Sequence, residues 1–92
     1  SMFNEINLKK LVFINSKIRE IPDGIYKLIN LKILDCSKNS ISKISEKLYK
    51  LIKLNKIIFE TNEINEISEN IGNLINLKEI NFSYNNILEI PI

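Results

Sequence analysis

The sequence contains no histidine and no tryptophan, and it has one cysteine, two glycines and two prolines. One cysteine cannot form an internal disulfide, and without histidine the usual zinc-binding sets cannot be assembled. A cysteine nucleophile would also lack a histidine base. These absences disfavour metal sites and cysteine–histidine catalysis, and we expect no metal, no cofactor and no enzyme activity. A lone cysteine also favours a reducing, cytoplasmic (intracellular) setting.

Charge and hydropathy disfavour two further classes. The net charge is +2 and no run of like charges occurs, whereas a nucleic-acid binder usually gathers its lysines into a strongly basic face. There is no signal peptide and no apolar run of transmembrane length, so the sequence predicts neither a nucleic-acid nor a membrane partner. Apolar residues make up 45% and charged residues 26% of 92 residues, which predicts one soluble folded domain.

A period of 23 residues runs through the chain without insertion or deletion, and its copies begin at Leu8, Leu31, Leu54 and Leu77. Counted from these leucines, several positions keep one kind of residue. Position four is Leu11, Leu34, Ile57 and Ile80; position six is Phe13, Cys36, Phe59 and Phe82; position nine is Ser16, Asn39, Asn62 and Asn85; position eleven is Ile18, Ile41, Ile64 and Ile87. A later column holds Ile29, Ile52 and Ile75, preceded by Ile6. The period predicts repeats at 8–30, 31–53, 54–76 and an incomplete 77–92, after a lead-in of 1–7 in which Ser1 resembles a tag scar.

The segments "LKILDCSKNSISKI", "LNKIIFETNEINEI" and "LKEINFSYNNILEI" resemble the leucine-rich repeat motif L-x-x-L-x-L-x-x-N-x-L. The resemblance covers residues 8–92, and the 23-residue length with "EIPDGIYKL" is similar to the intracellular class found in Ras-associated and scaffold proteins. It implies an α/β fold, a right-handed solenoid with a concave parallel sheet and short helical or 3₁₀ segments on the convex side. It also implies a role in protein–protein interaction.

The residues themselves predict the same architecture. Positions four and six are apolar or hold the small Cys36, with polar or small residues between them in part of the repeats, which is the pattern of a half-buried strand. Strands that recur every 23 residues in one direction pair in parallel, and the segments 22–30, 45–53 and 68–76 would carry the chain back as short helices or 3₁₀ turns. Ser45 and Ser68 can cap two of these turns. We expect the core to consist of the repeated Leu, Ile and Phe columns.

Two residue types with possible chemistry are interpreted as structural. Asn39, Asn62 and Asn85 would form an asparagine ladder, because an inward amide can satisfy backbone groups of adjacent loops that no regular ladder reaches. Cys36 occupies a column that is otherwise phenylalanine and points inward, where a cysteine acts as a small hydrophobe. In the same stretch Asp35, Ser37 and Lys38 should face outward.

Charged residues give weaker signals. Glu60, Glu63, Glu66 and Glu69 recur every third residue but fall on a strand end, a loop and a return segment, so we expect a solvated surface rather than a catalytic or metal site. Lysines at positions two and three would form a stripe where the strands begin, which can be read either as a patterned protein contact or as an ordinary solvated rim. The stripe comprises Lys9, Lys10, Lys32, Lys56 and Lys78.

The concave face is the candidate binding surface. Positions three, five, seven and eight point out of the sheet, and several carry apolar residues where solvent is expected. The residues we assign to partner binding are Lys10, Val12, Ile14, Ile33, Asp35, Lys56, Ile58, Glu60 and Tyr84. The main hypothesis is a module that binds a protein or peptide there. The alternative is a structural piece of a longer repeat array, or a block that self-associates through its exposed repeat ends.

Overall fold

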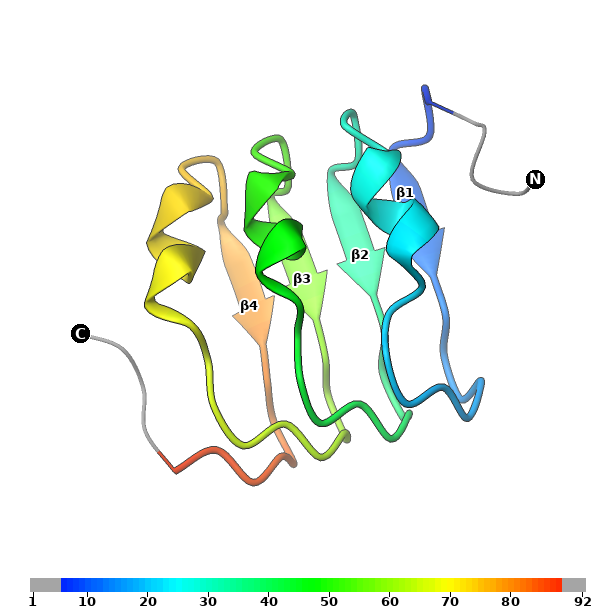
Figure 1. Cartoon of the computed structure of the whole chain (residues 1–92), viewed down its shortest axis with the longest axis vertical. Coiled ribbons are helices and arrows are strands. Elements are labelled where there is room, and N and C mark those ends of the chain that lie inside the picture. Colours follow the sequence, from blue (N-terminus) through cyan, green and yellow to red (C-terminus); the bar gives the residue numbers. More distant parts are fainter. Residues whose placement is uncertain (1–5, 89–92) are drawn as a thin grey trace.

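The computed structural model describes residues 6–88, in which four strands form one sheet. In Figure 1 the strands lie side by side, and one turn of the superhelix joins each strand to the next. The strands are β1 (Lys10–Val12), β2 (Ile33–Asp35), β3 (Lys56–Ile58) and β4 (Glu79–Asn81). They pair in parallel in the order β1-β2-β3-β4, with Leu11 opposite Leu34, Leu34 opposite Ile57 and Ile57 opposite Ile80. This register equals the sequence period, so every column predicted from the repeat becomes a row across the sheet.

Three 3₁₀ helices carry the chain back behind the sheet: η2 (Asp23–Lys27), η3 (Glu46–Lys50) and η4 (Glu69–Asn73). They begin inside the predicted return segments. The Ser45 hydroxyl accepts a hydrogen bond from the Lys47 amide at 3.2 Å, and the Ser68 hydroxyl accepts one from the Asn70 amide at 3.0 Å. Each cap satisfies a backbone donor that has no partner within its helix, which fixes where the helix starts.

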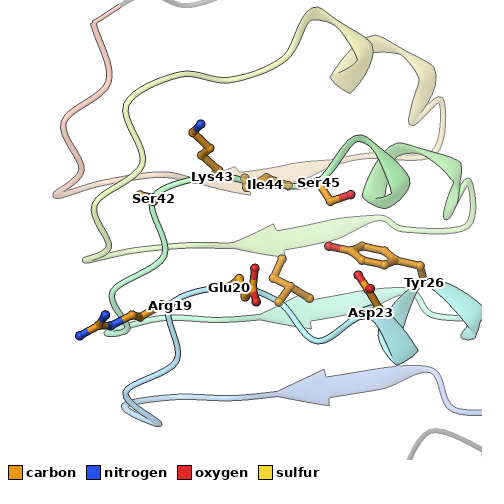
Figure 2. Close-up of a pocket in the computed structure, with 9 residues that line it drawn as sticks. Arg19, Glu20, Asp23, Tyr26, Ser42, Lys43, Ile44 and Ser45 are labelled. Carbon is orange, nitrogen blue, oxygen red and sulfur yellow. The ribbon is translucent and has the colours of Figure 1, made fainter.

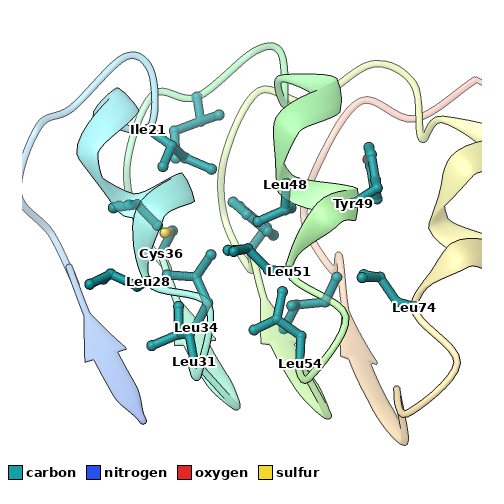
Figure 3. Packing of buried hydrophobic residues seen from close by; sticks show 14 of the residues in the cluster. Ile21, Leu28, Leu31, Leu34, Cys36, Leu48, Tyr49, Leu51, Leu54 and Leu74 are labelled. Atoms are coloured by element: carbon teal, nitrogen blue, oxygen red, sulfur yellow. The ribbon is translucent and has the colours of Figure 1, made fainter. Parts of the chain in front are cut away.

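The hydrophobic core lies between the sheet and the 3₁₀ helices (Figure 3). Leu31 and Leu34 of the second repeat and Leu54 and Ile57 of the third are completely buried, and Phe59 stacks on Phe82 with ring centroids 5.5 Å apart. Stacked rings and aliphatic rows bridge each repeat to the next, so the core is continuous along the solenoid. The predicted α/β leucine-rich repeat solenoid is confirmed by this arrangement.

One predicted core column is wrong. The isoleucines that follow Leu28, Leu51 and Leu74 lie at the turns between helix and strand, and they are exposed rather than packed in the core. Their leucine neighbours take the inward position at the last residue before each turn, which leaves the isoleucine side chain on the outside of the bend. The exposed column comprises Ile6, Ile29, Ile52 and Ile75.

The asparagine side chains connect the loops that follow the strands. The Asn62 amide nitrogen donates to the carbonyls of Cys36 (2.9 Å) and Phe59 (3.0 Å), and its oxygen accepts from the Ile41 amide at 3.0 Å. Asn39 and Asn85 make the equivalent bonds one repeat earlier and one repeat later. Each amide therefore joins its own loop to the preceding repeat through backbone groups that no strand pairing reaches. Ser16, which stands in the first repeat's asparagine position, is exposed.

Candidate binding surface on the concave sheet

The outward-facing residues of the sheet form two rows fixed by the strand register. The first row is Lys10, Ile33, Lys56 and Glu79, and the second is Val12, Asp35, Ile58 and Asn81. The residues between the rows, Leu11, Leu34, Ile57 and Ile80, point to the opposite side, because successive side chains of a strand alternate faces. The predicted direction of each residue on these strands follows from this register.

Apolar side chains on the two rows enclose a carboxylate. Val12 and Ile58 lie directly on either side of Asp35, and Ile33 precedes Asp35 by two residues on the same face of β2. Val12 is 42% exposed and Ile14, further along the same chain segment, is 48% exposed, while Ile33 and Ile58 are half-buried. The apolar patch is therefore not continuous along one row. It surrounds Asp35 on three sides, and we call these four residues, Val12, Ile33, Asp35 and Ile58, the concave patch.

The Asp35 carboxylate is held in place by the residue two positions later. Its Oδ1 atom accepts hydrogen bonds from the Ser37 hydroxyl at 2.6 Å and from the Ser37 amide at 3.0 Å. Ser37 is only 6% exposed, so the expectation that it faces solvent is wrong: its hydroxyl turns toward Asp35 and is covered. Asn81 repeats the amide part of this turn, accepting from the Ser83 amide at 2.9 Å. An anchored carboxylate keeps a defined position for a cationic partner.

Charged residues border the concave patch. Lys10 and Lys56 stand on either side of Ile33, and the Lys56 ammonium lies 3.4 Å from the Glu79 carboxylate. The Lys56 and Glu79 side chains are 36% and 58% exposed, so this partly exposed ion pair contributes little to stability and leaves Lys56 within reach of a partner. Glu60, two residues after Ile58, is half-buried.

The residue at position eight of every repeat has a left-handed backbone conformation. The φ angles are 55° at Asn15, 58° at Lys38, 60° at Thr61 and 59° at Tyr84. The first three donate their amides to the next repeat, to Ser37, Glu60 and Ser83 at 2.8–3.0 Å, so the bend continues the parallel ladder beyond the strands. Tyr84 is exposed at this rim, in the repeat of β4, and lies three strands away from Val12. The structure thus brings together the predicted residues on β1 to β3 and leaves Tyr84 apart from them.

One sequence family and two solved structures resemble this chain. The sequence model described as Leucine Rich Repeat matches residues 30–51 and 76–92. The chain folds as a leucine-rich repeat solenoid. A leucine-rich repeat protein of Leptospira interrogans has 26% identity and a TM-score of 0.86 over 96% of this chain and 22% of its own. An internalin (InlF) of Listeria monocytogenes has 34% identity and a TM-score of 0.82 over 95% of this chain and 25% of its own.

The chain therefore spans about a quarter of the length of these two structures. No curated protein sequence matches it. The comparisons support a leucine-rich repeat protein, and such repeats are in general protein-interaction modules. Within the part of the chain that the structure describes, no helix is long and apolar enough to cross a membrane.

Cys36 of this leucine-rich repeat solenoid is completely buried, and Figure 3 shows it among the leucines of the second repeat. Burial, with a smaller contribution from the charge of Asp35, raises the pKa of the Cys36 thiol to about 12. A thiol with that pKa is protonated at neutral pH and is a poor nucleophile. Between residues 6 and 88 no three acidic or cysteine side chains gather into a metal-binding group. The burial and the raised pKa of the thiol agree with the structural interpretation of Cys36.

A hollow that the sequence did not indicate lies between the segments leading to η2 and η3 (Figure 2). It measures about 360 Å³, and it is lined by Arg19, Glu20, Ile21, Asp23, Tyr26, Ser42, Lys43, Ile44 and Ser45. Burial raises the pKa of the Tyr26 hydroxyl, while its hydrogen bond with Ser45 partly opposes the shift. The lining of the hollow contains side chains of both charges, and in Figure 2 the Arg19 and Lys43 side chains extend away from the hollow.

Tyr49, which is outside this hollow, is also buried, and burial raises the pKa of its hydroxyl to about 12.

Proposed function

We propose that this chain is a non-catalytic interaction module whose concave sheet binds a protein or peptide. The observation that supports it is the concave patch, in which Val12, Ile33 and Ile58 surround the anchored carboxylate of Asp35. Apolar side chains in partial contact with water beside a fixed charge are typical of protein contact sites. The proposal extends to the 23-residue intracellular class of repeat and to a cytoplasmic location.

The chemistry of the concave patch suggests a particular kind of partner. Ser37 satisfies one oxygen of Asp35, so that carboxylate can still accept a charge-assisted hydrogen bond from an incoming lysine or arginine. Val12 and Ile58 would cover the methylene groups of that side chain and exclude water. The partner would therefore present a basic residue flanked by aliphatic or aromatic side chains.

Selection from a library of random peptides tests this proposal. Peptides that bind the wild-type protein should be enriched in a lysine or arginine with apolar neighbours. Asp35→Asn should weaken the binding of these peptides by about tenfold or more, because it removes the negative charge that pairs with the partly buried lysine or arginine of the peptide. Ile33→Glu with Ile58→Glu should abolish binding, since it places two carboxylates on the half-buried patch.

A matched control is Ile29→Glu with Ile52→Glu, which makes the same chemical change at the exposed turns just before β2 and β3. It should leave peptide binding unchanged, and circular dichroism should show native spectra for all variants. Selected peptides that bind the concave variant as well as the wild type would contradict the proposal. That result would favour the alternative of a structural segment in a longer array, which the short span of the chain against both solved structures also suggests.

A further inference from the structure

The turns that join each 3₁₀ helix to the next strand form one edge of the solenoid, seen at the top of Figure 1. Each of these turns exposes an isoleucine, with Ile29 56%, Ile52 53% and Ile75 82% exposed, and Ile6, at the turn before β1, is 53% exposed. None of these four residues is among the buried core residues or the partly buried side chains that pack against them. We call them the isoleucine stripe. These exposed aliphatic side chains recur at one position of successive repeats and so form a strip of apolar surface, which is typical of a contact site.

Lysines border the isoleucine stripe on the side of the sheet. Two adjacent shallow hollows, of about 410 and about 270 Å³, lie there and share Lys32 and Lys53. Lys9 completes the first hollow and Lys78 the second, and asparagines supply the rest of both linings. No carboxylate lines either hollow.

Lysines also border the stripe on the side of the helices. Lys27 and Lys50, both exposed, close η2 and η3, and their carbonyls accept hydrogen bonds from the amides of Ile29 and Ile52 at 3.0 Å. The turns that end the first and second repeats therefore place an apolar side chain between two rows of positive charge.

Asparagine side chains hold the turns of the isoleucine stripe in register. Asn30 donates to the carbonyl of Ile6 at 3.0 Å, and Asn76 donates to the carbonyl of Ile52 at 2.9 Å. The Lys53 ammonium donates to the Asn30 side-chain oxygen at 2.8 Å, in place of a bond to the backbone. Because these bonds tie neighbouring turns together and the strands pair residue for residue, we expect the isoleucines to follow the strand spacing, which is about 4.8 Å in a β-sheet.

We propose that the isoleucine stripe binds an acidic amphipathic α-helix of a partner protein. An α-helix repeats its apolar face every turn, about 5.4 Å, which is close to the spacing of the stripe. Glutamates and aspartates that flank the apolar face would meet the two lysine rows. A bilayer fits less well, because the stripe is one side chain wide and contains no aromatic residue. A single-stranded nucleic acid would also find no aromatic ring to stack on.

This surface is separate from the concave patch, so the two proposals stand or fall independently. The probe is a synthetic peptide with leucines at helical spacing and glutamates flanking them. Its two controls carry lysines in place of the glutamates, or the same residues in scrambled order. We expect the acidic peptide to bind, to gain helical circular dichroism on binding, and to weaken as salt increases. The lysine and scrambled peptides should not bind.

Variants locate the binding site. Ile29→Ser with Ile52→Ser should weaken the acidic peptide by about tenfold or more, and so should Lys32→Glu with Lys53→Glu. All four side chains lie at the surface, so the fold should persist, which denaturation midpoints would verify. The concave variant Ile33→Glu with Ile58→Glu should bind the acidic peptide normally.

Three outcomes would overturn the proposal. One is failure of the acidic peptide to bind the wild-type protein, and another is binding that depends on Ile33 and Ile58 rather than on the stripe. The third is stronger, stripe-dependent binding to vesicles of phosphatidylcholine and phosphatidylserine, which would assign the edge to an anionic lipid surface.

Discussion

The middle two repeats and the outer two have nearly the same sequence pattern, but their core side chains differ in how deeply they are buried. At position four, Leu34 and Ile57 are completely buried, whereas Leu11 is half-buried and Ile80 is 49% exposed. The middle residues have a neighbouring repeat on both sides, while each outer residue has one such neighbour within the described chain. The energetic weight of a residue in the repeat is thus set by its neighbours as much as by its type.

The asparagine ladder shows the same contrast in its polar groups. Asn62 is buried and bonds to backbone groups of Cys36, Ile41 and Phe59, which are themselves buried. Asn39 makes more hydrogen bonds than Asn62, but several of its partners, including the Ser16 amide, are within reach of water. Burial and the number of bonds therefore predict opposite orders of importance for these two asparagines.

The largest effect should come from truncating the middle of the core. Leu34→Ala should lower the free energy of unfolding by about 2–5 kcal/mol, because it removes a buried side chain and leaves a cavity. Leu11→Ala, the same change in the same column, should cost clearly less, since water already reaches that side chain. Urea denaturation measures both. Equal losses of unfolding free energy in the two variants would show that burial of the side chain does not set the cost of truncating it.

The next effect concerns the ladder. Asn62→Ala should cost about 1–3 kcal/mol, because it leaves buried backbone donors and acceptors without partners. Asn39→Ala should cost less despite removing more hydrogen bonds, since water can replace many of them. Thermal and urea denaturation of both variants would compare them. A larger loss for Asn39→Ala would mean that the number of bonds outweighs their burial.

The fold could be predicted from sequence because the same pattern of apolar and polar residues recurs in every repeat. Four copies of the leucine column and three of the asparagine column define the strands, the return segments and the inward direction of Asn62. The site could be predicted only in part, because the outward residues differ from repeat to repeat. Periodicity placed Ile33 and Asp35 on the concave face, but it could not show that Ser37 turns its hydroxyl onto Asp35. That contact depends on local geometry beyond the alternation of faces.

Periodicity was misleading at the isoleucine stripe. A uniform isoleucine column beside a uniform leucine column suggests two core positions, and only the path of the turn decides which residue points inward. Exposure of Ile29 and Ile52 is therefore a property of the turn and not of the residue type. A repeated apolar residue identifies a repeated environment, but not whether that environment is the core or a contact surface.

The smallest expected effect concerns the residue at position eight, where the third repeat has a threonine and the first repeat an asparagine. Thr61 and Asn15 share the left-handed conformation, at φ 60° and 55°, but threonine is β-branched and asparagine adopts that region readily. Thr61→Asn should therefore raise the free energy of unfolding by about 1 kcal/mol, while the Thr61 amide keeps its bond to the Ser83 carbonyl at 2.8 Å. Thr61→Ser removes only the branch and should give a smaller gain. The urea midpoint measures both changes, and a lower midpoint for Thr61→Asn would show that the exposed threonine side chain stabilises the third repeat more than its backbone strain destabilises it.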